Sequence, residues 1–129
     1  MSVLIVDDDV NLQVLLTTFL EDAGYTVHTA ATGADALRHV RQAAELPDVL
    51  LLDIAMPVMT GWGFLREQHH DPRLAAIPVI LMTALGRFDH EDVPPSVVAA
   101  LPKPLDLTEL EALLAVFARP SLQMRAIGA

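Results

Sequence analysis

Short runs of apolar residues alternate along this sequence with longer amphipathic stretches. An unbroken apolar run, such as residues 3–6 or 49–52, fits a strand covered on both faces, because a strand with one face in water alternates apolar with polar residues. Together with residues 25–30, 77–82 and 97–101, these runs predict five strands. Strands of this kind separated by helices predict an α/β fold, a parallel sheet with helices on both faces.

The amphipathic stretches have the spacing of helices. Apolar side chains recur at i, i+3, i+4, i+7 and i+8 from residue 12 to residue 20, and Gly24 follows where helices commonly end in glycine. Asp9 and Asp106 are expected to cap helix N-termini. Further helices are expected around residues 37–44, 62–70 and 106–117.

A proline pair interrupts the segment between the fourth and fifth strands. Pro94 and Pro95 forbid helix beyond about Val93, because proline lacks an amide hydrogen and restricts the residue before it. The fourth helix is therefore expected to be short or irregular. Otherwise five strand–helix units in 129 residues fit one doubly wound, five-stranded parallel sheet with the flavodoxin-like order 2-1-3-4-5. We expect one domain over residues 1–118 and a frayed tail over residues 119–129.

The charge of the chain limits the partners that it can attract. Eight Lys and Arg residues stand against 17 Asp and Glu residues, a formal net charge of −9, which disfavours binding to nucleic acid or to an anionic membrane through bulk charge.

Cysteine is absent, so disulfides, thiolate nucleophiles and cysteine–zinc sites are excluded. The apolar runs are far shorter than the roughly 18 residues of a membrane span. The first residues lack the basic start of a signal peptide, so the expected location is the cytoplasm.

Polar residues stand at the carboxyl ends of the predicted strands, where ligands bind in open α/β sheets. They are Asp7 and Asp8 after the first strand, Asp53 after the third, Thr83 after the fourth, and Lys103, the only lysine, after the fifth. Three crowded carboxylates repel one another unless a cation lies between them, and two carboxylates with waters and a phosphate oxygen suit Mg²⁺. An ionised aspartate can attack a phosphoryl group, while the metal, an ammonium and a hydroxyl stabilise the charge on the phosphoryl oxygens.

In this order, these residues resemble the receiver domain of response regulators in two-component signalling. The matching stretches, within Ser2 to about Phe117, are Val6-Asp7-Asp8, Leu52-Asp53 with Met56-Pro57 and Gly61, Thr83-Ala84, and Lys103-Pro104. The resemblance implies a phosphoprotein that takes its phosphoryl group from a sensor histidine kinase or a histidine phosphotransfer protein and then alters its binding to a downstream protein. It implies a signalling protein that takes part in its own phosphorylation and dephosphorylation, not an enzyme.

The resemblance also implies a role for each residue of the cluster. Asp53 would be the phosphoacceptor. Asp8 and Asp53 would bind Mg²⁺ directly, with the backbone carbonyl of Ala55, and Asp7 would reach the ion through water. Lys103 would pair with the phosphoryl oxygens and, before phosphorylation, with Asp53.

Positions beside the cluster take their expected roles from the same resemblance. Thr83 would be the switch hydroxyl that moves toward the phosphoryl group, the small Ala84 would leave access to Asp53, and the Lys103–Pro104 peptide bond would be cis. Receivers usually have an aromatic switch residue three positions before the lysine, where this chain has Ala100. This departure leaves the phosphorylation site intact and falls on the face through which many receivers signal.

Three alternative functions stay open beside the receiver. A phosphohydrolase with an aspartyl nucleophile would carry a second acid two residues later, which Asp53-Ile54-Ala55 lacks. A flavodoxin would need a phosphate loop after the first strand, where residues 7–9 are all acidic. A receiver-like interaction module that works without phosphorylation is disfavoured by the site itself, and only Ala100 and the unusual fourth segment favour it. We expect the phosphorylated receiver, either standing alone or cut from a longer chain, because no output domain follows the last helix.

Overall fold

The computed structural model describes residues 1–54, 61–83 and 94–128, with side chains as far as Phe117. The strands in these residues are β1 (Ser2–Val6), β2 (Thr26–Ala30), β3 (Val49–Asp53), β4 (Val79–Thr83) and β5 (Val97–Pro102). The helices are α1 (Val10–Asp22), α2 (Gly33–Gln42), α3 (Gly61–His70) and α4 (Leu107–Gly128).

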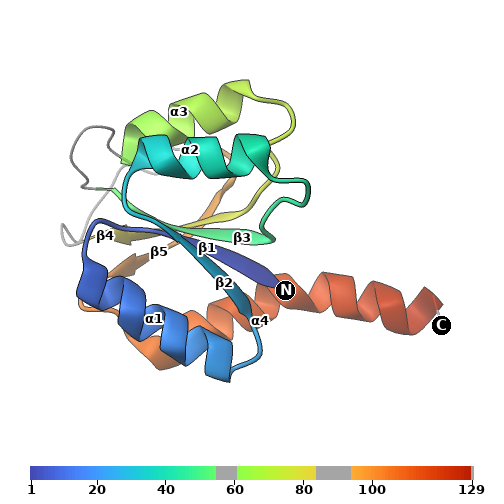
Figure 1. Ribbon diagram of the computed structural model, residues 1–129. Coiled ribbons are helices and arrows are strands. Elements are labelled where there is room, and N and C mark those ends of the chain that lie inside the picture. Colours follow the sequence, from blue (N-terminus) through green and yellow to red (C-terminus); the bar gives the residue numbers. More distant parts are fainter. Residues whose placement is uncertain (55–60, 84–93, 129) are drawn as a thin grey trace.

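The five strands form one sheet in the order β2-β1-β3-β4-β5, and all neighbouring pairs are parallel (Figure 1). This confirms the doubly wound, flavodoxin-like order predicted from the sequence. Strand β1 lies between β2 and β3, so that Leu4 is in register with His28 on one side and Leu50 on the other. All residues of β3 and β4 are buried, as expected for apolar strands covered on both faces.

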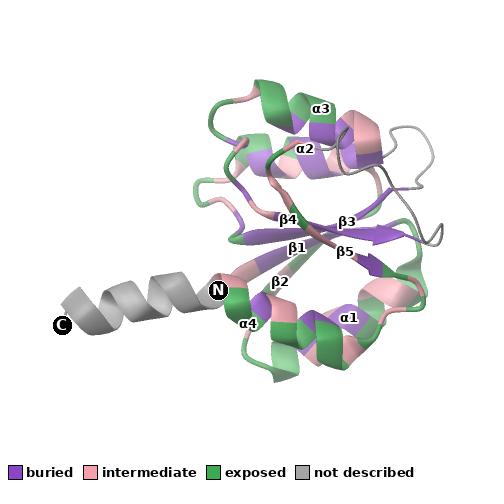
Figure 2. Cartoon of the chain, turned by 180° about the vertical axis from the view of Figure 1, so that it is seen from behind, coloured by how far each residue is buried: buried purple, intermediate pink, exposed green. Residues whose placement is uncertain are grey.

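Two layers of helices sandwich this sheet. Helices α2 and α3 lie on one face and α1 and α4 on the other (Figure 1), and the buried residues gather where each layer meets the sheet (Figure 2). Because side chains alternate along a strand, Leu4 joins the cluster that contains Phe64 of α3, and Ile5 joins the cluster that contains Leu16 of α1 and Leu110 of α4. The sheet is therefore the shared wall of two apolar cores.

The predicted helix caps are confirmed. The Asp9 carboxylate accepts a hydrogen bond from the backbone N–H of Leu12 at 3.2 Å. The Asp106 carboxylate accepts from the N–H groups of Thr108 at 2.9 Å and Glu109 at 3.1 Å. Both side chains satisfy amide hydrogens that no carbonyl of the helix can reach.

Two element boundaries differ from the sequence prediction. Helix α2 ends at Gln42, earlier than predicted, because Ala43 leaves helical dihedral angles (φ −69°, ψ 132°) and the Arg73 guanidinium binds the carbonyl groups at this end. Strand β4 begins at Val79, two residues later than predicted, because Pro78 has no amide hydrogen for the sheet. Both differences arise from backbone hydrogen bonding, which apolar periodicity does not report.

Helix α4 continues to Gly128, through the stretch where a frayed tail was expected. Periodicity reports which residues are buried, whereas residues such as Leu, Gln, Met, Arg and Ala in this stretch favour helix intrinsically. The predicted short or irregular fourth helix would fall within residues 84–93, outside the described residues. No described helix has the length and apolar character that crossing a bilayer requires.

Candidate functional site

The carboxyl ends of four strands bring the predicted site residues to one edge of the sheet. Asp7 follows β1, Asp53 and Thr83 are the last residues of β3 and β4, and Lys103 follows β5. Oxygen atoms of the Asp7, Asp8 and Asp53 carboxylates all lie within 4.8 Å of one another. Asp53 and Thr83 are only 5% and 6% exposed, so these two polar side chains are largely shielded from solvent.

Asp7 is held firmly by its neighbours in this cluster. It is completely buried, its N–H donates to the Ala30 carbonyl at 3.1 Å, and its Oδ1 accepts from the N–H of Asp9 at 2.8 Å. Its Oδ2 pairs with the Lys103 ammonium at 2.7 Å. A buried carboxylate is costly unless it is paired and hydrogen-bonded, and Lys103 provides the opposite charge that Asp7 needs inside the fold.

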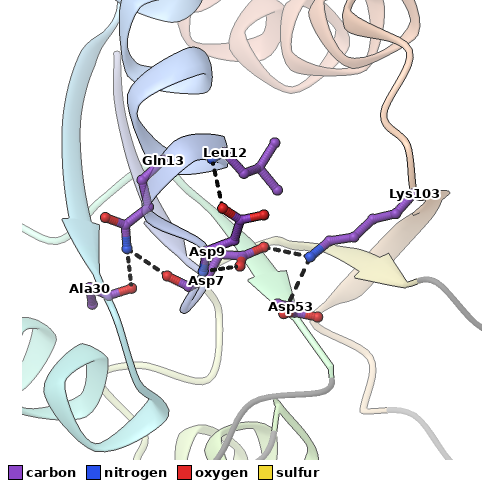
Figure 3. Close-up of polar contacts among 7 residues, drawn as sticks. All are labelled: Asp7, Asp9, Leu12, Gln13, Ala30, Asp53 and Lys103. Carbon is purple, nitrogen blue, oxygen red and sulfur yellow. Dashed lines mark hydrogen bonds and ion pairs between the residues drawn. The ribbon is translucent and has the colours of Figure 1, made fainter.

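Lys103 links two of the three carboxylates (Figure 3). Its Nζ lies 2.7 Å from Asp7 and 3.3 Å from Asp53. Burial by itself lowers the pKa of the Lys103 ammonium, but the hydrogen bond and negative charge of Asp7, reinforced by Asp53, outweigh this and raise the pKa above its usual value. The resemblance implied the pairing with Asp53, which is present; the nearer partner, Asp7, was not predicted.

The donor set of the cluster fits a hard divalent cation. Three carboxylates and one ammonium carry a formal charge of −2, and carboxylate oxygens are the ligands that Mg²⁺ prefers. Asp8 is exposed whereas Asp7 and Asp53 are buried, so the cluster opens to solvent on the Asp8 side. The Ala55 carbonyl, a further expected ligand, lies outside the described residues, as does Ala84.

Gln13 of α1 lies beside this site, although it was not among the residues predicted from the sequence. Its side-chain amide donates to the backbone carbonyls of Asp7 at 2.5 Å and Ala30 at 3.2 Å. The signal was present in the sequence, because Gln13 precedes the buried residues Leu16 and Leu20 by three and seven positions. A polar residue in that stripe of the helix points inward and needs acceptors.

Gly61 joins the start of α3 to the end of β3. Its N–H donates to the Ile54 carbonyl at 2.8 Å, and a Cβ atom at this position would lie 2.5 Å from the Asp53 carbonyl oxygen and 2.7 Å from the Ile54 Cα. Glycine is therefore required by close backbone contact. From the sequence, Gly61 is identified only through the family resemblance, and the close backbone contact supplies the physical reason for it.

Two other predicted features can be located. The Lys103–Pro104 peptide bond is cis, as the resemblance implied. Ala100, at the position of the usual switch aromatic, is partly buried and packs against the cluster beneath α2 and α3, as does Trp62 at the start of α3.

Comparison with protein families and curated sequences gives a consistent result. Residues 3–115 match the family model described as "Response regulator receiver domain". The chain is 34% identical over 116 residues to Response regulator Rre1 of Synechocystis, an alignment that covers 88% of this chain and 49% of that protein. The chain spans about half the length, or less, of the curated relatives that it matches.

Solved structures with the same fold include two response regulators. The Vibrio cholerae chemotaxis protein CheY4 superposes with a TM-score of 0.73 at 31% identity, covering 89% of this chain and 97% of that one. The response regulator TrrA of Thermotoga maritima, solved in complex with Mg²⁺-BeF, superposes with a TM-score of 0.77 at 26% identity, covering 90% and 97%.

Proposed function

This chain belongs to the response regulator receiver domain family, and from that premise we propose that Asp53 is its phosphoacceptor. The chain is a signalling protein of the two-component type. The observation that supports the choice of Asp53 is its position: it ends the central strand β3, within 4.8 Å of two other carboxylates and 3.3 Å from the Lys103 ammonium. Of the three carboxylates, Asp53 alone belongs to the central strand of the sheet, which lies between β1 and β4.

The proposed reaction is an in-line transfer from a phosphohistidine. An Asp53 carboxylate oxygen forms a bond to phosphorus, and the P–N bond to the donor imidazole breaks, with its electron pair leaving on that nitrogen. The product is an acyl phosphate on Asp53 and a histidine that takes up a proton. Lys103 pairs with the phosphoryl oxygens, because its ammonium already lies between Asp7 and Asp53.

Mg²⁺ is the proposed cofactor. Asp8, Asp53 and the Ala55 carbonyl would hold it directly, and Asp7 would hold it through water. When bound, Mg²⁺ neutralises negative charge on the transferring phosphoryl group. The Asp7–Lys103 pair limits the charge that the ion must balance, since one carboxylate of the three already has a cationic partner.

We also propose the roles of the residues around the phosphoryl group. The Thr83 hydroxyl hydrogen-bonds a phosphoryl oxygen, and Ala84 leaves the approach to Asp53 open. Ala100 has no ring that could change its rotamer, so the aromatic part of the usual switch is missing at this position. The donor is a sensor histidine kinase or a histidine phosphotransfer protein, and the receiver of the signal is a downstream protein.

The decisive test is phosphorylation with a small donor. Wild-type protein with Mg²⁺ and acetyl phosphate should gain the mass of one phosphoryl group, and Asp53→Asn should gain none. Asp9→Asn is the matched control, because Asp9 is a neighbouring acid that caps α1 and asparagine is also a good N-cap; it should be phosphorylated like the wild type. An unchanged wild-type mass overturns the function, and modification of Asp53→Asn overturns the site.

A further inference from the structure

We propose that Gln13 is a positioning residue that fixes the direction of the Asp7–Asp8 acid pair. Its side chain reaches from α1 to the ends of two neighbouring strands. The Nε2 group donates to the carbonyl of Asp7, directly after β1, and to the carbonyl of Ala30, the last residue of β2 (Figure 3). A primary amide has two N–H donors, and here both are directed at the backbone beside the acid cluster.

The bond to the Asp7 carbonyl fixes a whole peptide unit. The carbonyl of Asp7 and the N–H of Asp8 belong to one planar group, so an anchored oxygen sets the orientation from which the Asp8 side chain leaves the backbone. The other polar atoms of Asp7 are already held by Ala30, Asp9 and Lys103. Gln13 therefore supplies the last restraint on the turn between the two acids.

Asp8 depends on this restraint more than its neighbour does. Asp7 is buried and paired, whereas in the described part of the chain no hydrogen bond or ion pair restrains the exposed Asp8 carboxylate. Among the described residues, the direction of the Asp8 side chain is therefore set by its backbone. Without the Gln13 amide, the peptide can rotate and Asp8 must be reordered each time that it meets a cation, which weakens the affinity for the cation.

A second glutamine offers a matched control. Gln68 in α3 is fully buried and also donates to two backbone carbonyls, those of Leu74 and Ile77, each at 3.0 Å. It has the same chemistry as Gln13 but contacts no residue of the acid cluster. Replacing either residue by leucine removes two hydrogen bonds to backbone carbonyls, and at Gln68 also the bond from the Ser96 hydroxyl. A change in Mg²⁺ affinity seen only in the Gln13 variants is therefore specific to the cluster.

The test measures Mg²⁺ binding by calorimetry on unphosphorylated protein, and so depends on the proposed function only in that Mg²⁺ must bind. Gln13→Leu and the near-isosteric Gln13→Met should bind Mg²⁺ roughly tenfold more weakly than the wild type. The Mg²⁺ concentration for half-maximal phosphorylation by acetyl phosphate should rise by the same factor, with an unchanged rate at saturating Mg²⁺. The amide NMR signal of Asp8 should shift in the metal-free variants.

The control separates positioning from general weakening. Gln68→Leu should lower the thermal midpoint yet keep the wild-type Mg²⁺ affinity and Asp8 amide signal; if it is too unstable to measure, Gln42→Leu on the exposed end of α2 replaces it. Wild-type Mg²⁺ affinity in both Gln13 variants overturns the role of Gln13 while leaving the function of Asp53 intact. If the wild type binds Mg²⁺ but is not phosphorylated, Asp53 loses its role and the Gln13 measurement still stands.

Discussion

Helices α2 and α3 are tied to their surroundings by charged side chains, whereas α1, and α4 as far as Phe117, contain no lysine or arginine at all. On the α2/α3 layer, Arg41 of α2 pairs with Glu67 of α3 at 3.3 Å. Arg73, in the loop after α3, donates to the Val40 carbonyl at 2.9 Å and also to the Ala43 carbonyl. Ion pairs and hydrogen bonds thus join α2 to α3 and the loop after α3 to the end of α2.

The α1/α4 layer is held mainly by apolar packing against the sheet. Its outer surface exposes large apolar side chains, with Val10 and Val14 of α1 more than 60% exposed and Val116 of α4 55% exposed. In the described residues its side-chain hydrogen bonds lie at the starts of the two helices: the caps Asp9 and Asp106, and Gln13 beside the acid cluster. Polar substitutions should therefore be costly on the α2/α3 layer, and on the α1/α4 layer they should matter mainly near the site.

The largest effect should come from Gln68→Leu. This variant leaves the buried carbonyls of Leu74 and Ile77 without donors and removes the acceptor of the Ser96 hydroxyl. Each unsatisfied buried group costs about 1–3 kcal/mol, so urea denaturation should show a loss of about 2–4 kcal/mol. Gln42→Leu, on an exposed side chain, should change stability by less than about 0.5 kcal/mol. Equal losses of stability in the two variants would mean that the hydrogen bonds of Gln68 do not stabilise α3.

Gly61→Ala should follow, because it forces α3 away from β3. The new methyl group meets the Asp53 carbonyl and the Ile54 Cα, both backbone atoms that cannot rotate aside. Overpacking of this kind costs about 1–3 kcal/mol. Gly24→Ala provides a contrasting control: it has open space around it but a φ of +97°, so its cost comes from backbone strain and should leave Mg²⁺ affinity unchanged. A Gly61→Ala protein with wild-type stability and Mg²⁺ affinity would contradict the close contact.

Arg73→Ala should have a smaller effect on the same layer. It removes donors from the carbonyls at the end of α2, but the side chain is exposed and water can replace it, so a loss of about 1 kcal/mol is expected. Arg66→Ala is the matched control from the same layer and should be close to neutral. Hydrogen exchange of the α2 C-terminal amides should accelerate only in the Arg73 variant.

Tyr25 tests electrostatics on the other layer. Burial, and the nearby charge of Glu111, raise the pKa of the Tyr25 phenol. The neutral phenol therefore stabilises the fold below its unfolded pKa of about 10, and this contribution is lost as the pH rises through the higher folded pKa. Tyr25 is the only tyrosine, so tyrosinate absorbance reports it alone. Glu111→Gln should lower the midpoint of the tyrosinate titration, but not as far as the unfolded value, because burial is the larger cause. Glu109→Gln should not move this midpoint.

The smallest effect is expected for Val14→Ser. This side chain is 61% exposed, so the substitution removes little buried apolar area. The free energy of unfolding should change by less than about 0.5 kcal/mol. Phosphorylation by acetyl phosphate should be unchanged. A loss above 1 kcal/mol would mean that the outer face of α1 is covered in solution, for example by a second copy, and a concentration-dependent thermal midpoint would detect this.

Much of the architecture could be predicted because apolar runs and turn residues report it directly. Consecutive apolar residues in β1, β3 and β4 indicated strands covered on both faces, and the acids and the lysine at their ends placed the cluster at one edge. The last residue of α2 and the first residue of β4 could not be predicted as well. The first depends on the guanidinium of Arg73, thirty residues away, and the second on the missing amide hydrogen of Pro78.

The site was predicted less completely than the fold for a related reason. Residue type and order identified Asp7, Asp53 and Lys103 as neighbours, but not that Asp7 is the nearer partner of the ammonium. The role of Gln13 is a matter of which carbonyl lies within reach of a side chain, and only the three-dimensional arrangement shows that. The contributions of Ala55 and Ala84 remain predictions, since both lie outside the described residues.

The Asp7–Lys103 contact joins residues 96 positions apart in the chain. During synthesis Asp7 is added to the chain long before Lys103, and a protease that cuts before β5 separates the two residues. A molecule that lacks β5 therefore also lacks the counter-charge of the buried Asp7 carboxylate. Because Lys103 follows β5, which lies at one edge of the sheet, this buried pair can form only after the last strand has joined the sheet.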